Sequence, residues 1–186
     1  MKNKIEDIFE CKEVDYGDSK GKWIVFKEDF LQAKKDFIVF VLFQKPKIFQ
    51  KILFSLCKDK SIKWIENFNK NLAFSESRKL EINNEAEFSK FYNEFRLNYY
   101  EYNLFYSEDE ELYILMDDDD NFHVLCHKDT LRKVFDLEFI FANDAMLYET
   151  FNTFKGYHQI VLNLYSKYFF SKRITIDDFR IIDKRE

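Results

Sequence analysis

The chain has 186 residues and a formal net charge of -5, because 34 Asp and Glu outnumber 29 Lys and Arg. This acidity argues against nucleic acid or a membrane as the main partner, since both attract positively charged proteins. With 3 Gly and 1 Pro the composition excludes collagen-like repeats and glycine-rich phosphate loops, whereas 23 Phe, 11 Tyr and 2 Trp supply ample apolar surface for a core.

Two short β-strand patterns stand near the N-terminus. Residues 11–16 and 22–26 flank a segment that holds two of the three glycines, which predicts a turn between antiparallel strands. A short polar helix is predicted at 28–35. The apolar run at 36–44 predicts a strand, but a single helix at 29–43 is also open, because periodicity alone does not separate a buried strand from a buried helix.

A pair of helices is predicted next. Pro46 suits a first helical turn, and apolar residues recur every three or four positions as far as Lys58. Ser61 is placed to cap a second helix at 61–73. The short polar link between the two helices predicts that they form a hairpin.

A short strand is predicted at 78–82, before another helix. Asn84 and Glu87 have the spacing of a capping box, in which the first side chain accepts the backbone N–H of the second residue and the second side chain accepts the backbone N–H of the first. Aromatic residues follow at helical spacing, which predicts a helix at 85–99.

The stretch at 99–135 is the most regular part of the sequence, and it predicts a three-stranded antiparallel meander followed by a short helix. The three apolar segments are 102–106, 112–116 and 122–127. The middle segment is continuously apolar, as expected for a strand covered on both faces. The acidic segments between them favour turns, because Asp and Asn side chains can hydrogen-bond nearby backbone amides. Asp129 or Thr130 is placed to cap the short helix.

The C-terminal part has a less regular pattern. Residues 137–141 suggest a further strand, and Asn143 is placed to cap a helical region at 143–169. Alternation at 173–182 predicts a last short strand. Together these elements predict a single α+β domain over residues 1–186, in which an antiparallel sheet centred on the meander is covered by amphipathic helices.

The aspartate run at 117–120 partly matches the pattern of a calcium-binding loop. Asp117, Asp119 and Asn121 match the start of an EF-hand loop, but Phe122 stands where glycine is required and Lys128 where a bidentate Glu belongs. The run is therefore interpreted as a solvated turn.

Histidine and cysteine give no site either. On a strand His123 and His127 share a face but lie about 13 Å apart, too far to bind one ion, and Cys126 points the other way. His123 and His127 are interpreted as exposed or hydrogen-bonded. Cys11, Cys57 and Cys126 are far apart in the sequence, which favours small core residues in a reducing, cytoplasmic protein. We predict no catalytic, cofactor-binding or metal-binding residue.

Two acidic segments are candidate contacts for a protein partner with a basic surface. Their residues are Glu108, Asp109, Glu110, Asp117, Asp118, Asp119 and Asp120. Such charges raise association rate and specificity. Because consecutive turns of a meander lie at opposite ends of the sheet, the two segments form separate negative patches. A simple role in solubility is equally open.

The stretch YNLFYSEDEELYILMDDDDNFHVLCHKDTLRKVF, which ends at Phe135, resembles immunity proteins of bacterial polymorphic and contact-dependent toxin systems. The similarity is in the order strand, polar turn, strand and helix, and it covers about a fifth of the chain. It implies a non-enzymatic protein that binds and blocks a cognate toxin domain. An enzyme with a site that is not visible in the sequence, and an oligomeric accessory protein, stay open as alternatives.

Overall fold

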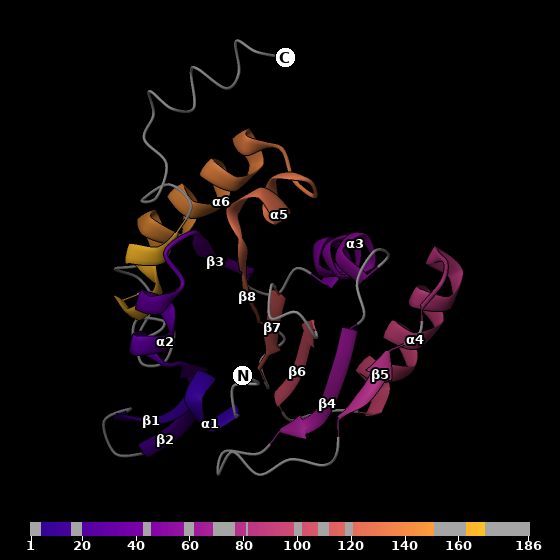
Figure 1. Ribbon diagram of the computed structural model, residues 1–186, viewed down its shortest axis with the longest axis horizontal. Helices are drawn as coiled ribbons and strands as arrows, with labels where there is room; N and C mark the ends of the chain where they lie inside the picture. Colours follow the sequence, from indigo (N-terminus) through magenta and orange to yellow (C-terminus); the bar gives the residue numbers. More distant parts are fainter. Residues whose placement is uncertain are drawn as a thin grey trace.

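A six-stranded antiparallel sheet forms the centre of the computed structural model (Figure 1). The structure describes residues 5–15, 20–42, 46–57, 62–68, 77–80, 82–98, 102–107, 112–117, 121–150 and 163–169. The strand order is β3-β8-β7-β6-β4-β5. The strands are β3 (Phe37–Leu42), β4 (Ile62–Phe68), β5 (Arg78–Leu80), β6 (Tyr102–Ser107), β7 (Leu112–Met116) and β8 (Phe122–His127). The α+β fold and the meander β6-β7-β8 are therefore confirmed.

The sheet buries both of its faces, because side chains alternate along each strand. One face carries Val41, Leu104 and Leu115, and it packs against the N-terminal elements and residues 163–169. The other face carries Phe105 and Ile114, and it packs against the middle helices of the chain. Burial of one such apolar side chain contributes about 1.5–3 kcal/mol. Every residue of β7 is buried, as its continuous apolar run predicts.

The elements that cover the two faces lie on opposite sides of the sheet in Figure 1. The first face is covered by α1 (Ile5–Ile8), the hairpin of β1 (Phe9–Asp15) and β2 (Lys20–Phe26), and α2 (Glu28–Ala33). The second face is covered by α3 (Pro46–Cys57), α4 (Glu85–Asn98) and α5 (Lys128–Arg132). The α6 helix (Leu137–Thr150) contributes residues to both cores.

Several local predictions are confirmed. The β1 and β2 strands pair antiparallel, and α2, β3, α3 and β5 lie where they were expected. The alternative of one helix at 29–43 is wrong, because α2 ends at Ala33 and β3 begins at Phe37. Asn84 Oδ1 accepts the N–H of Glu87 at 2.9 Å, and Glu87 Oε2 accepts the N–H of Asn83 at 2.9 Å, which caps α4.

The predicted helix at 61–73 is wrong in its described part, because residues 62–68 form β4. This strand lies between β6 and β5, and its register shifts between Ile65 and Phe68. Ile62, Trp64 and Ile65 are all buried, the first two on one face and Ile65 on the other. A strand covered on both faces loses the alternation that would distinguish it from a helix. Residues 61 and 69–73 lie outside the described residues.

The predicted strand at 137–141 is also wrong, because α6 begins at Leu137. Its cap is Asp136, whose Oδ1 accepts the N–H of Phe139 at 2.6 Å, and Asn143 lies inside the helix. The helix touches both cores, so its sequence lacks a polar face that would reveal the helical period. The α5 helix is capped by His127 Nδ1, which accepts the N–H of Asp129 at 3.2 Å, and not by Asp129 or Thr130.

The C-terminal predictions are tested only in part. The 3-10 turn η1 (Ser166–Tyr168) ends the described C-terminal segment, and the residues before it are helical from 163. The predicted helix at 151–162 and the strand at 173–182 lie outside the described residues. Within the part of the chain that is described, no helix is both long and apolar enough to cross a bilayer.

Candidate functional site

Three polar residues form a buried cluster where β7 turns into β8. Asp117 directly follows β7, Asn121 directly precedes β8, and His123 is the second residue of β8. The β7–β8 register pairs Leu115 with His123 and Met116 with Phe122, so it places Asp117 opposite Asn121. All three side chains therefore lie on the same face as Leu115, and each has 0% of its surface exposed. We call Asp117, Asn121 and His123 the turn anchor.

The Asp117 carboxylate accepts three hydrogen bonds within the turn anchor. The Asn121 backbone N–H donates to Oδ1 at 2.8 Å, and Asn121 Nδ2 donates to Oδ2 at 3.0 Å. His123 Nε2 lies 3.2 Å from Oδ2. The backbone closes the turn as well, because the Asp117 N–H donates to the Asn121 carbonyl at 3.0 Å. Asp117 and Asn121 thus hold each other in place at the ends of β7 and β8.

The charge state of Asp117 follows from these contacts. Burial works to raise the pKa of its carboxyl group, but the hydrogen bond and charge of His123 and the two hydrogen bonds from Asn121 outweigh burial and hold the pKa below its ordinary value. The carboxylate is therefore ionised at neutral pH although no solvent reaches it. A buried charge of this kind is stable only while its partners stay in place.

Tyr165 packs on the turn anchor from the C-terminal segment. Its ring lies 5.6 Å from the His123 ring at 80°, an edge-on contact, and its hydroxyl oxygen accepts the N–H of Phe26 at 2.9 Å. Burial, with smaller effects from the negative charges of Asp117 and Glu10, raises the pKa of the Tyr165 phenol far above its ordinary value, against the opposing hydrogen bond from Phe26. The phenol is neutral at physiological pH, and it joins β2 to residues 163–169.

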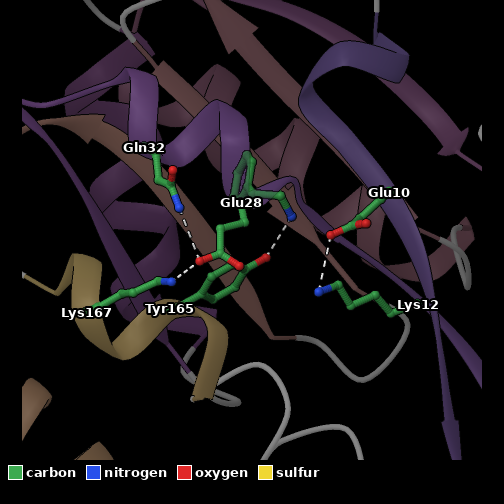
Figure 2. Close-up of polar contacts among 7 residues, drawn as sticks. Glu10, Lys12, Glu28, Gln32, Tyr165 and Lys167 are labelled. Atoms are coloured by element: carbon green, nitrogen blue, oxygen red, sulfur yellow. Dashed lines mark hydrogen bonds and ion pairs between the residues drawn. The ribbon is translucent and has the colours of Figure 1, made fainter.

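Two ion pairs lie near Tyr165 (Figure 2). Glu28 on α2 binds the Lys167 ammonium and accepts a hydrogen bond from Gln32 Nε2 at 3.3 Å, and Lys12 pairs with Glu10 at 3.3 Å on β1. The Lys167 hydrogen bond and charge lower the pKa of the Glu28 carboxyl group. Ion pairs that solvent reaches stabilise little, so the Glu28–Lys167 pair adds only slightly to the packing that holds residues 163–169 in place.

The structure corrects one part of the predicted contact surface. The expectation that the whole 117–121 segment is a solvated turn is wrong for Asp117 and Asn121, whose side chains are fully buried. A buried carboxylate cannot contact a partner from the surface. The other predicted contact residues, Glu108, Asp109, Glu110, Asp118, Asp119 and Asp120, lie outside the described residues.

The histidine and cysteine predictions have mixed outcomes. His123 is buried and hydrogen-bonded, and His127 is partly exposed and caps α5. Cys126 is a buried free cysteine, as predicted, but Cys11 is partly exposed and is not a core residue. The side chain of Cys57 lies outside the described part of the structure. Over the described ranges, no group of three or more His, Cys, Asp or Glu side chains is arranged to hold a metal ion.

The turn anchor could have been found in the sequence from the positions of its residues relative to the strands, although not from their residue types. Asp117 directly follows a strand predicted to be covered on both faces, and the β7–β8 register places Asn121 and His123 on its own face. Tyr165 could not have been found in this way, because it is 42 residues beyond His123 and only the tertiary fold brings the two rings together.

Comparison with known proteins adds no relationship. No protein-family model matches the chain, and neither the curated proteins nor the solved structures contain a match to it.

The turn anchor makes acid stability a direct test of its geometry. Because the folded pKa of Asp117 is below its ordinary value, its contribution to stability is complete above about pH 4 and is lost as the pH falls toward the folded pKa. We expect the difference in unfolding free energy between the wild type and Asp117→Asn to narrow as the pH falls below about 4. Urea titrations across this range measure it.

Asp29→Asn is the matched control, because it removes the same charge from an exposed position on α2. The free energy of unfolding of Asp29→Asn should differ little from that of the wild type at every pH. A difference for Asp117→Asn that stays constant through the acid range would contradict an ionised, hydrogen-bonded Asp117.

Proposed function

We propose that this chain is a non-enzymatic protein-binding protein, an inhibitor of the immunity type that binds and blocks a basic toxin domain. The observation that carries the proposal is the turn anchor. In the sequence Asp118, Asp119 and Asp120 stand between Asp117 and Asn121, and hydrogen bonds between these two flanking residues extend the β7–β8 pairing. Three consecutive carboxylates between two residues fixed in this way suit electrostatic docking.

Fixed ends favour binding for an energetic reason. A charged segment whose ends are already fixed loses less conformational entropy when a partner binds it than a segment with free ends does. Complementary charge also steers the encounter and raises the association rate. The net charge of -5 adds to this attraction for a basic domain.

The buried Asp117–His123 pair has a structural role in this proposal. Both side chains have 0% exposure, and the carboxylate is hydrogen-bonded to Asn121 and His123. A general base needs to lie within hydrogen-bond reach of a substrate proton. The geometry of this pair therefore supports turn formation more directly than catalysis.

The test is protection and binding with a defined partner. The genes beside that of the chain are screened for a basic domain that arrests growth, this domain is co-expressed with the chain, and growth is compared with and without the chain. Association of the purified pair is then followed by surface plasmon resonance. We expect restored growth, and an association rate that falls about tenfold or more between about 0.05 and about 0.5 M salt.

Two triple variants separate local charge from net charge. Asp118→Asn, Asp119→Asn and Asp120→Asn together should lower the association rate by about tenfold. The control combines Asp29→Asn, Glu85→Gln and Glu138→Gln, which removes the same total charge from exposed positions on α2, α4 and α6, and it should lower the rate much less. Equal effects would limit the proposal to net charge, and no protection by the wild type would refute it.

A further inference from the structure

The β3 strand is an edge strand with an unusual composition. It is the first strand in the order β3-β8-β7-β6-β4-β5, so only β8 pairs with it within the described sheet. All six of its residues are apolar, and Ile38 to Leu42 each have 0% exposure. An apolar edge strand of this length is a template for pairing with another chain, unless something covers it.

The register shows which backbone groups of β3 face its free edge. The Lys128 N–H donates to the Asp36 carbonyl at 3.1 Å and extends the β3–β8 pairing. Hydrogen-bonded and non-hydrogen-bonded pairs alternate in an antiparallel ladder. Val39 and Val41 are therefore in non-hydrogen-bonded pairs, and their N–H and C=O groups point away from β8.

The α6 helix crosses this edge. Asn143 Nδ2 donates to the outward Val41 carbonyl at 3.1 Å, and Asn143 is only 5% exposed. Ile140, one turn earlier, lies in the core on one face of the sheet, and Leu147, one turn later, lies in the core on the other face. The helix therefore passes over the edge with Asn143 at the crossing point. Figure 1 shows α6 near β3 and β8.

The opposite edge of the sheet has a different form. The β5 strand is only three residues long, and Lys79 in its middle is exposed. Short length and lysine are common ways of preventing edge-to-edge pairing. The β3 strand has neither feature, so its edge depends on a cover, and among the described elements both α6 and η1 contact this strand.

We propose that α6 guards the free edge of β3 against strand pairing with a second copy of this chain, and that the hydrogen bond from Asn143 to Val41 anchors this guard. When the anchor is lost, the outward groups of β3 accept the same strand from another molecule, in an antiparallel pair about a two-fold axis. This inference is independent of the proposed inhibitor function, because it concerns the free protein.

The test compares two variants of α6 that differ in how they act. Asn143→Ala removes the donor to Val41, whereas Leu147→Ala removes core packing from the same helix and leaves the anchor in place. We expect Asn143→Ala to raise the self-association constant by about tenfold over the wild type in sedimentation equilibrium, because an outward backbone acceptor has lost its partner. Leu147→Ala should raise it less, although it removes more buried surface. Circular dichroism verifies the fold of both, and Asn143→Ser repeats the measurement with a different short side chain.

A second-site change locates the new contact. Val39→Pro removes an outward N–H without removing a ladder bond to β8, so adding it to Asn143→Ala should return self-association to the wild-type level. Self-association that is no greater for Asn143→Ala and Asn143→Ser than for Leu147→Ala would overturn the proposal. Self-association that persists with Val39→Pro, or loss of the fold in both Asn143 variants, would overturn it as well.

Discussion

Replacing Asp117 with alanine is expected to lower the free energy of unfolding by about 3–5 kcal/mol, because each buried donor that loses its acceptor costs about 1–3 kcal/mol. The change removes the acceptor of three hydrogen bonds that come from Asn121 and His123. Burial increases the effect, because the remaining donors stay in an environment without water. Urea unfolding at neutral pH, followed by circular dichroism, gives the value.

The control for this prediction is Asp29→Ala on the surface of α2, where we expect a change within about 0.5 kcal/mol. The loss of unfolding free energy for Asp117→Asn should lie between those for Asp117→Ala and Asp29→Ala, because the amide keeps one acceptor oxygen and the size of the side chain. Similar small effects for Asp117→Ala and Asp29→Ala would show that Asp117 is a solvated turn residue, as the sequence alone predicted.

Replacing Trp64 with alanine should also cost about 3–5 kcal/mol, the range for removal of a buried aromatic side chain. Trp64 stacks on Phe105 of the adjacent strand with ring centroids 5.9 Å apart, and it meets Phe91 of α4 edge-on at 5.2 Å. Its Nε1 also donates to Asn103 Oδ1 at 3.2 Å. The predicted helix at 61–73 would place Trp64 at the edge of an apolar face, where its removal has a smaller effect.

Trp64→Phe separates the two contributions of this residue. It keeps an aromatic ring but loses the hydrogen bond to Asn103, so we expect a loss of about 0.5–1.5 kcal/mol from that bond, with packing changes added to it. Equilibrium unfolding of both variants provides the comparison. A loss below about 1 kcal/mol for Trp64→Ala would contradict the position of Trp64 in β4.

The meander shows where sequence periodicity was sufficient. Its strands are adjacent in the chain, so turn residues and apolar patterns identify both the elements and their pairing. Apolar periodicity predicted the wrong element at 62–68, because β4 lies between β6 and β5 and both its faces are covered. The pairing of β4 with β6 joins segments that are far apart in the sequence, and no local signal specifies it.

The candidate site was also predictable from the sequence only in part. The sequence predicted the aspartate run to be a solvated turn, but Asp117 is buried under Tyr165 and the other residues that cover this face of the sheet. The role of Asn143 was hidden for the same reason. Asn suits a helix cap by its local preferences, whereas its hydrogen bond to Val41 spans 102 positions in the chain.

The sequence by itself determined the α+β class, the meander, the N-terminal hairpin and the α3 and α4 helices, because each of these depends on contacts between near neighbours in the chain. Only the tertiary structure decided that 62–68 is a strand, that α6 crosses the edge of β3, and that one carboxylate of the acidic turn is buried. The physical reason is that burial on two sides removes the polar positions from which a period is recognised. Which polar groups then meet inside is set by packing between segments that are distant in the sequence.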